Sequence, residues 1–233
     1  MLWGGTPRSQ AVSKFVERGR RIAVGAGEMP LEARALVGAG QEGALVASCR
    51  SGDAAAFARL VELHEGMVVN LSARLLGDPE EARDVAQEVF LQVYRMLGRF
   101  EGRSSLKTWI YRIAVNQCHN RRRFWHRRRR DKEEALDEGL LVAAASGTRE
   151  STHTSPYEAA RQGERARRVQ SALLQVSFEH RSVLVLREVE GLTCEEVAAA
   201  LGVPEGTVKS RLSRAREAMR VRLRDLVEEG ARP

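Results

Sequence analysis

Residues 191–212, GLTCEEVAAALGVPEGTVKSRL, decide the fold of the C-terminal part of this chain, because their pattern predicts a helix-turn-helix. Ala198 is small where the two helices would touch, and Gly202 can take the left-handed backbone that the turn requires. The apolar side chains expected to seal the shared core are Val197, Leu201, Val203 and Val208. A chance sequence rarely meets all of these demands together.

The second helix of such a unit enters the major groove of duplex DNA. Its polar residues expected to face base edges and phosphates are Lys209, Ser210, Ser213 and Arg214, and Arg211 and Arg216 are expected to flank phosphates. Its expected core residues are Val208, Leu212, Ala215 and Met219. An amphipathic helix with a basic solvent-exposed face is the simpler alternative, but turn chemistry and cation placement agree on the helix-turn-helix.

The composition favours a polyanionic partner. The chain has 233 residues, with 38 Lys+Arg against 31 Asp+Glu and a formal net charge of +7. An ordinary basic soluble protein is the alternative. Cys49, Cys118 and Cys194 lie far apart, so we expect no disulfide framework, no zinc-ligand site and a reducing cytoplasmic location. We also expect no cofactor.

The N-terminal residues 1–40 lack sustained periodicity and are expected to form a flexible extension, or to precede a true start at Met29. Arg20 and Arg21 precede a short apolar run that superficially resembles an export signal, but the run ends at Gly25. No apolar stretch approaches the roughly 20 residues needed to cross a bilayer, so we expect no membrane insertion.

Residues 41–130 have helical periodicity and form the first expected module. Residues 51–53 would end one helix and cap the next, which would end at Gly77. Residues 78–81, DPEE, then supply an N-cap, a proline at the first helical position and a glutamate placed to return the capping bond. The apolar stripe of that helix is Ala82, Val85, Ala86, Val89, Phe90 and Val93.

The other face of that helix carries Asp84, Glu88 and Gln92, which periodicity alone assigns to solvent. Ser105 can cap a long helix with two chemically different sides. One side holds Leu106, Trp109, Ile110, Ile113 and Gln117, with Trp109 equally suited to core or contact; Thr108, Tyr111, Arg112, His119 and Arg122 are expected to point away.

The long helix leads into residues 121–130, RRRFWHRRRR, a cationic block that binds nucleic acid or forms a solvated tail. Residues 131–155 turn acidic and then small and polar, so we expect a flexible linker. A second module, 156–230, begins with a Ser155 cap and Pro156. Its expected apolar positions are Val169, Leu173, Val176, Val183, Leu184, Leu186 and Val189.

Two motifs together resemble one family. Residues 206–211, GTVKSR, look like the fourth conserved region of sigma factors. Residues 84–90, DVAQEVF, with Phe100 and 108–114, TWIYRIA, resemble sigma region two. With only these two regions, the chain is similar to the extracytoplasmic-function (ECF) class of the sigma-70 family. The resemblance implies an all-α fold, with a region 2 helical bundle and a region 4 helix-turn-helix joined by the linker.

The resemblance also implies roles for residues. A set docking on the coiled coil of the largest subunit of core RNA polymerase would be Asp84, Gln87, Glu88 and Gln92. The set binding the melted minus-ten strand would be Phe100, Arg112, Asn116, His119 and Asn120. The set binding the duplex minus-thirty-five element would be Lys209, Ser210, Arg211, Ser213 and Arg214. An anti-sigma factor would mask both modules until a stress or other signal releases them.

Two departures limit this likeness: Val176-Ser177 stands where the family often has Leu-Pro, and Ser213 is small at an expected base contact, so the promoter sequence does not follow. A two-domain repressor remains a rival and predicts tight duplex binding without polymerase. A free RNA-binding protein using residues 121–130 is another. A nuclease is disfavoured because the five histidines have no ligand spacing, and we expect no catalysis.

Overall fold

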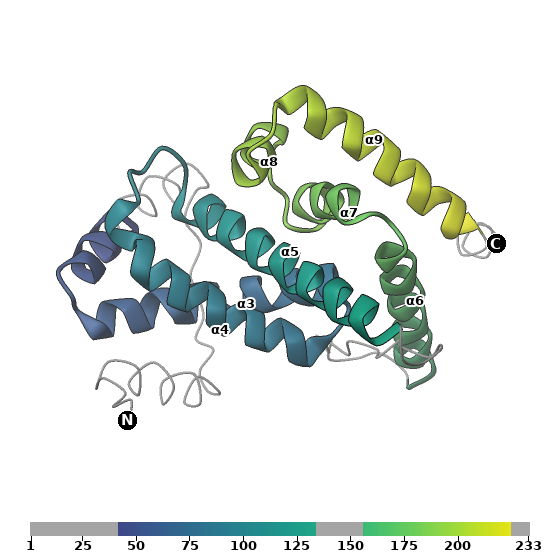
Figure 1. Ribbon diagram of the computed structural model, residues 1–233, viewed down its shortest axis with the longest axis horizontal. Helices are drawn as coiled ribbons and strands as arrows, with labels where there is room; N and C mark the ends of the chain where they lie inside the picture. Colours follow the sequence, from purple (N-terminus) through teal and green to yellow (C-terminus); the bar gives the residue numbers. More distant parts are fainter. Residues whose placement is uncertain (1–41, 134–155, 225–233) are drawn as a thin grey trace. The chain divides into compact units, whose positions relative to one another are not determined.

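A computed structural model describes residues 42–133 and 156–224, and the side chains of 42–128 and 163–224 within them. The expected N-terminal extension, most of the expected linker and residues 225–230 lie outside the described residues. All regular structure in the described ranges is helical, as the sequence predicts (Figure 1). The chain divides into two compact units, 1–64 and 65–233, with the boundary inside one helix. No helix in the described ranges is long and apolar enough to cross a membrane.

The first unit contains a helix over residues 42–50 and the beginning of α3 (Ala54–Leu76). Between them, Gly52 has a φ of 89° and Asp53 caps α3 by accepting hydrogen bonds from the backbone nitrogens of Ala55, at 2.8 Å, and Ala56, at 3.3 Å. This is the predicted break at 51–53. The buried apolar residues of the unit are Val46, Cys49, Phe57, Leu60 and Val61.

The second unit continues α3 and adds α4 (Pro79–Met96). Asp78 caps α4 by accepting from the backbone nitrogens of Glu80, at 2.9 Å, and Glu81, at 3.2 Å. The predicted return bond from the glutamate at the third position is wrong, because the Glu81 carboxylate pairs with Arg121 instead. The predicted apolar stripe is confirmed, since Ala82, Val85, Ala86, Val89, Phe90 and Val93 are all buried.

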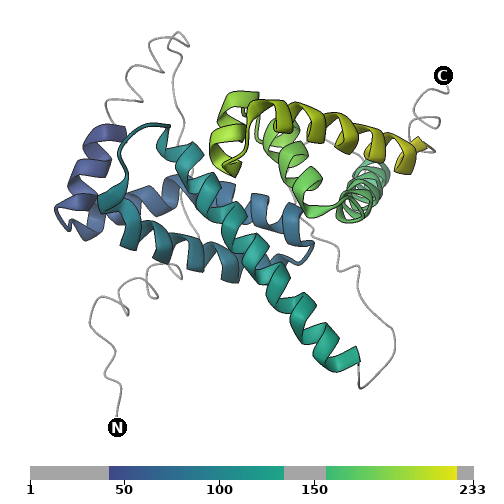
Figure 2. The same ribbon diagram turned by 45° about the horizontal axis from the view of Figure 1, so that its top comes forward.

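Helix α5 (Leu106–Glu133) packs against α4, and the two lie side by side in both views (Figures 1 and 2). Ser105 caps it, because its Oγ accepts a hydrogen bond from the backbone nitrogen of Thr108 at 3.1 Å. The helix continues through Asp131 to Glu133, three residues into the range expected to be linker. The backbone of the whole cationic block, residues 121–130, therefore lies within a regular helix.

A short helical turn, η1 (Leu97–Arg99), follows α4. The elements after α5 are α6 (Pro156–Leu174), α7 (Phe178–Leu184), the π-helical turn η2 (Val185–Val189), α8 (Cys194–Leu201) and α9 (Glu205–Arg222). Helix α9 packs against both α7 and α8. The expected core residues Leu173, Val176, Val183, Leu184 and Leu186 are buried. Helix α7 therefore packs against the second helix of the helix-turn-helix and shares its core.

Two residues expected on the apolar stripe of this part are exposed instead. Val169 is 41% exposed on α6, and Val189 is 49% exposed at the end of η2. In η2 the backbone nitrogen of Glu190 donates to the carbonyl of Val185, five residues earlier. A turn of this width rotates Val189 away from the face that regular helical spacing predicts.

Arg181 is a buried arginine that holds backbone ends together. It is 5% exposed, and its guanidinium donates to the carbonyl of Leu75 at the end of α3 and, at 2.9 Å, to that of Val176. A third bond goes to the carbonyl of Leu174. Burial, and secondarily the charge of Arg122, lowers the pKa of Arg181 to about 10. The carbonyls at the ends of α3 and α6, and one carbonyl in the turn after α6, thereby obtain a donor that no helix provides.

Candidate nucleic-acid and partner interfaces

The turn between α8 and α9 has the geometry of a helix-turn-helix. Thr193 and Glu196 form a capping box: the Thr193 Oγ1 accepts from the Glu196 nitrogen at 3.1 Å, and the Glu196 carboxylate accepts from the Thr193 nitrogen at 2.8 Å. Gly202 ends α8 with φ 66° and ψ 36°, and the Val203 nitrogen donates to the Ala198 carbonyl at 3.1 Å. The predicted motif is confirmed. The capping box was not predicted, although its T-x-x-E spacing is visible in the sequence.

Burial along α9 separates a core face from an exposed face. Val208, Leu212 and Ala215 are buried, and Met219 is half-buried. Of the residues expected to bind duplex DNA, Lys209, Ser210, Ser213 and Arg214 are exposed, and Arg211 is half-buried. The sequence therefore assigns these residues to the correct sides of the helix.

Two of the exposed residues have partners within α9. The Lys209 ammonium lies 2.8 Å from the Glu205 carboxylate, whose hydrogen bond and charge raise the pKa of Lys209. The Ser210 hydroxyl donates to the Thr207 carbonyl at 3.0 Å. Both interactions hold polar groups near the first turn of the helix without burying them.

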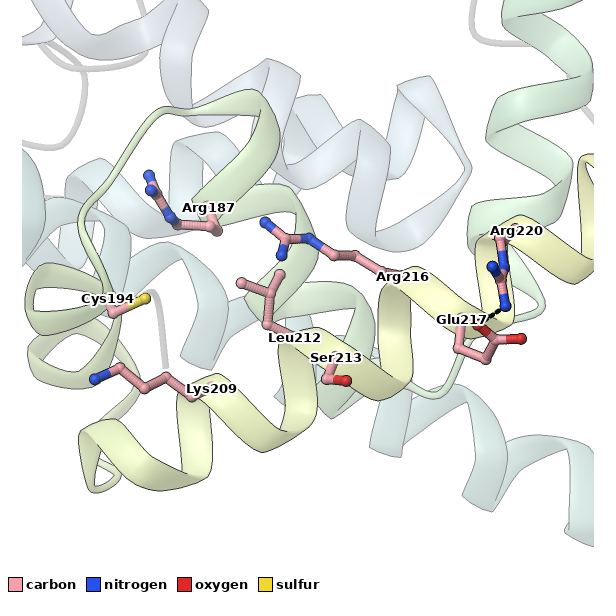
Figure 3. A pocket seen from close by; sticks show the side chains of 8 residues that line it. All are labelled: Arg187, Cys194, Lys209, Leu212, Ser213, Arg216, Glu217 and Arg220. Carbon is pink, nitrogen blue, oxygen red and sulfur yellow. Dashed lines mark ion pairs between the residues drawn. The ribbon is translucent and has the colours of Figure 1, made fainter. Parts of the chain in front are cut away.

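A basic hollow of about 580 Å³ lies beside α9 (Figure 3). Its lining contains one acidic residue, Glu217, and the polar or basic residues Arg187, Cys194, Lys209, Ser213, Arg216 and Arg220. Figure 3 shows Arg187 reaching it from outside α9, beside the Arg216 side chain. The Arg187 guanidinium is oriented by donating to the Leu192 carbonyl at 2.9 Å. Sequence reasoning missed Arg187, because only the fold brings η2 to α9.

The expected partner-binding face of α4 is largely exposed. Asp84, Gln87 and Glu88 are exposed, whereas Gln92 is half-buried and its amide nitrogen lies 3.2 Å from the Met96 sulfur. Two apolar residues share this face at helical spacing and were not anticipated: Leu91 is 37% exposed and Tyr94 is 41% exposed. The face is thus a mixed polar and apolar strip.

Arg121 occupies one end of that strip. Its guanidinium lies 2.5 Å from the Glu81 carboxylate and 2.6 Å from that of Glu88. Burial lowers the pKa of Arg121, but the charges and hydrogen bonds of Glu88 and Glu81 outweigh this and raise it overall. Glu88 is therefore engaged within the chain. Among the described residues, none donates a hydrogen bond to the Asp84 carboxylate.

The residues expected to bind a melted strand fall into two groups. Arg112, Asn116 and Asn120 are exposed on α5. Phe100 and His119 are half-buried against other rings: Phe100 lies 5.2 Å from Trp109, and the His119 ring lies 5.3 Å from that of Phe178, measured between centroids. Trp109 is itself half-buried, so its burial favours neither of the two predicted roles, a core residue or a contact residue.

Two residues of α5 expected to point outward are buried, and that prediction is wrong. Thr108 is 3% exposed and its hydroxyl lies 2.8 Å from that of Ser105. Tyr111 is fully buried and donates to the Glu190 carboxylate at 2.7 Å. Burial, followed by the interaction with Glu190, raises the pKa of Tyr111. Because α8 also packs on α5, this helix has more buried surface than an amphipathic pattern predicts.

No three His, Cys, Asp or Glu side chains within the described ranges gather to form a metal site. The sites are instead exposed helical faces. Such faces suit recognition of large partners.

Comparison with known proteins decides the family. The family model of Sigma-70 region 2 matches residues 60–136, and that of Sigma-70, region 4 matches 166–219. The RNA polymerase sigma-H factor of Pseudomonas aeruginosa is 36% identical over 189 residues, covering 81% of this chain and 97% of that protein. This chain is an ECF sigma factor of the sigma-70 family.

The ECF assignment also rests on relatives that carry this name. The ECF sigma factor SigW of Bacillus subtilis is 34% identical, covering 76% of this chain and 94% of its own length. The ECF sigma-E factor of Escherichia coli K12 is 33% identical, covering 78% and 94%. This sigma factor directs transcription initiation, and sigma factors are non-enzymatic subunits of RNA polymerase.

Solved structures agree on the fold. RpoE of Bartonella quintana, in complex with the anti-sigma factor NepR, has a TM-score of 0.57 at 23% identity and covers 72% of this chain and 96% of its own. CnrH, in complex with the cytosolic domain of CnrY, has a TM-score of 0.54 at 24% identity and covers 79% and 97%. The expected two-region helical fold is confirmed.

Proposed function

We propose that this sigma factor binds core RNA polymerase through the exposed face of α4 and recognises promoter DNA with α5 and α9. The observation that carries the proposal is the sidedness of α9. Its polar residues Lys209, Ser213 and Arg214 are exposed while Val208 and Leu212 anchor it. A recognition helix needs this division to enter a major groove.

On α4, the partner is the coiled coil of the largest polymerase subunit. Asp84 and Gln87 offer exposed hydrogen-bonding groups, and Leu91 and Tyr94 add apolar surface beside them. Interfaces combine apolar contact with a few polar groups that set orientation. Glu88 and Gln92 complete the polar set, with Glu88 shared with Arg121.

On α5, Arg112, Asn116 and Asn120 bind the unpaired bases and phosphates of the minus-ten element. Phe100 and His119 belong to the same site, and each has to leave its ring partner to stack on a base. Stacking on an aromatic side chain contributes roughly 1–3 kcal/mol per base, and an aromatic pair contributes roughly 0.5–1.5 kcal/mol. Exchange of ring partners is therefore favourable where base stacking lies in the upper part of its range.

On α9, Lys209, Ser210 and Arg214 face the duplex of the minus-thirty-five element, with Arg211 directed to a phosphate and Ser213 near the bases. Arg187 adds a cation from η2 to the same hollow. Guanidinium groups suit this role because they bind phosphate through two parallel hydrogen bonds.

An anti-sigma factor regulates the protein in the cytoplasm, and its release links transcription to a stress or other signal. The support comes from two structurally similar proteins: RpoE was solved in complex with the anti-sigma factor NepR, and CnrH was solved in complex with the cytosolic domain of CnrY. A pull-down from the host, asking which polymerase subunits and which small partner accompany the protein, tests both associations together.

Two variants, one on α4 and one on α9, test which helix face binds core polymerase and which binds promoter DNA. Asp84→Arg should weaken binding to core polymerase at least about 30-fold, because the charge of an exposed carboxylate on the docking face is reversed. Lys209→Ala with Arg214→Ala should leave core binding intact and abolish promoter-specific transcription, with the salt slope of DNA binding falling by about one per lost phosphate contact. Glu179→Arg reverses another exposed carboxylate and serves as the control.

Full promoter-specific transcription by the Asp84→Arg protein would refute the docking face. Loss of core binding in the α9 variant would refute the division of labour. Tight, specific duplex binding by the sigma factor without core polymerase would instead support the repressor alternative.

A further inference from the structure

Three of the four cations that line the hollow beside α9 are held by carboxylates of the same chain. The Lys209 ammonium lies 2.8 Å from the Glu205 carboxylate, one turn earlier on the helix. The Arg220 guanidinium lies 2.7 Å from the Glu217 carboxylate, a pair that is drawn as a dashed line in Figure 3. Both pairs lie within α9, on the side that faces the hollow.

The third pair joins α9 to η2. One carboxylate oxygen of Glu188 lies 3.1 Å from the Arg216 Nε and 2.5 Å from a terminal nitrogen of the same guanidinium. The fourth cation is Arg187, the neighbour of Glu188 in the chain, and its hydrogen-bond acceptor is the Leu192 carbonyl rather than a carboxylate. Residues 187 and 188 therefore bring one cation and one anion to this surface.

The carboxylates remove most of the positive charge from a surface that the proposed function directs toward duplex DNA. We call Glu188, Glu205 and Glu217 the paired carboxylates. The four cations of the hollow contribute four positive charges, and the paired carboxylates contribute three negative ones, which leaves a single net positive charge. A duplex carries one negative charge per roughly 1.7 Å, so its attraction to the hollow is weak while the pairs are closed.

All three pairs can open, because they lie in solvent. Their six side chains are between 44% and 76% exposed. Exposed ion pairs contribute little free energy and are screened by salt. A phosphate that is held in the right place can therefore displace a paired carboxylate, whereas a passing duplex finds each of these cations occupied.

Two other arginines of α9 provide a contrast. Arg214 is exposed and Arg211 is half-buried, and neither forms an ion pair with a residue that the structure describes. A duplex can bind these two groups without breaking an ion pair. The helix thus has two kinds of cation, one that is available at once and one that is exchanged against a carboxylate.

We infer that the paired carboxylates keep this sigma factor off bulk duplex DNA, by occupying their cations until the polymerase holds the promoter against α9. The inference rests on the proposed function of α9 and adds a restraint to it. Proteins often gain specificity through groups that penalise wrong partners. A genome offers a vast excess of non-specific sites, so the restraint leaves more of the protein available to core polymerase.

The test compares two triple variants of the full chain, without core polymerase, on a random-sequence duplex of about 30 base pairs. The first variant replaces the paired carboxylates: Glu188→Gln, Glu205→Gln and Glu217→Gln. The control replaces carboxylates that pair with arginines on α3, α4 and α6: Glu62→Gln, Glu80→Gln and Glu164→Gln. Both variants gain the same net charge and release three cations, but only the first releases them beside α9.

The first variant should bind the random duplex about 10-fold more tightly than the wild type near 0.1 M salt, since an exposed pair costs a factor of roughly 1.4 to 5. The control should gain less than about 3-fold. If each released cation binds a phosphate, the gain of the first variant should shrink about 40-fold between about 0.05 and 0.2 M salt. A first variant that binds no more tightly than the control would overturn the inference.

A double-mutant cycle tests whether Glu188 acts through its cation. Glu188→Gln should raise duplex affinity in the wild-type background, and should have no effect where Arg216→Gln has already removed the partner. An equal gain in both backgrounds would overturn the inference, because Glu188 would then repel DNA without occupying Arg216. The cycle needs only single and double variants, so it decides the question even where a triple variant folds poorly.

The consequence for transcription is measured on a promoter that the wild-type holoenzyme selects from a random library. Each protein is first mixed with random duplex, and core polymerase is added afterwards. The first variant should be inhibited at about one tenth of the duplex concentration that inhibits the wild type, in line with its higher affinity. Equal sensitivity of the two proteins would contradict the proposed restraint.

Failure of the proposed function of α9 gives a different result. Adding Arg214→Ala to the first variant should remove part of its gain, because the duplex is expected to lie along α9. A gain that ignores Arg214→Ala would count against α9 as the DNA-binding helix. By contrast, no gain at all, together with lost promoter-specific transcription in the Lys209→Ala and Arg214→Ala protein, would refute the restraint alone.

Discussion

Replacing Gly202 and Gly206 with alanine, one at a time, tests whether backbone conformation alone holds the turn between α8 and α9. At both positions the added methyl group would meet no atom within 4 Å, so neither change creates a steric clash. The glycines differ in backbone angle: Gly202 has a φ of 66°, whereas Gly206 lies in the first turn of α9 and is not among the glycines with positive φ.

The two substitutions should act in opposite directions. A left-handed conformation costs an L-residue roughly 1–2 kcal/mol, and alanine recovers about 0.4–1 kcal/mol by restricting the unfolded chain. Gly202→Ala should therefore lower the free energy of unfolding by about 1 kcal/mol. In a helix, alanine is favoured over glycine by up to about 1 kcal/mol, so Gly206→Ala should raise it by about 0.5 kcal/mol.

Urea unfolding of the full chain, followed by circular dichroism, measures both changes against the wild type. The midpoints should move to opposite sides of the wild-type value, with the slope unchanged in each case. Gly202→Asn should be milder than Gly202→Ala, because asparagine tolerates the left-handed region better. A Gly202→Ala protein as stable as the wild type, or a shift of both alanine variants in the same direction, would refute the reasoning.

Other predictions concern buried groups. A thiol reagent should modify Cys194 rapidly, because it is half-exposed, and Cys49 and Cys118 only on unfolding, which timed labelling would show. Burial raises the pKa of Cys118 to about 12 from an ordinary 9.0. The contribution of this thiol to the free energy of unfolding is therefore complete below about pH 9 and is lost between about pH 9 and 12. The free energy of unfolding of the Cys118→Ala protein should lack this pH dependence. Arg181→Met should lower the free energy of unfolding by about 2–4 kcal/mol, since three carbonyls lose a charged donor, and a stability equal to wild type in urea would contradict that role.

The features that the sequence predicted well depend on neighbours within a few residues. Asp78 and Ser105 are caps because a short polar side chain reaches a backbone nitrogen two or three positions ahead. Gly202 is a turn because it adopts an angle that other residues avoid. The polar and buried sides of α9 likewise follow from spacing alone.

The features that it missed depend on distant contacts. Tyr111 is buried, and its hydroxyl donates to the carboxylate of Glu190, 79 residues further along the chain. Arg187 joins the hollow beside α9 because η2 is brought there by the fold. Val189 is exposed because a π turn alters the local spacing. A single sequence holds no periodic signal for such pairings, so the amphipathic pattern of α5 was incomplete.

The ion pairs of Arg121 with Glu81 and Glu88 affect how strongly a cationic group of a partner can bind α4. A cationic side chain of a partner that bound Glu88 would displace the Arg121 guanidinium. It would not neutralise an unpaired carboxylate. The electrostatic gain of such an exchange is small, because one ion pair is dissolved as the next is made. The affinity of the proposed partner for this part of α4 therefore depends on shape complementarity and on apolar contact with Leu91 and Tyr94. The charges contribute to specificity for that partner.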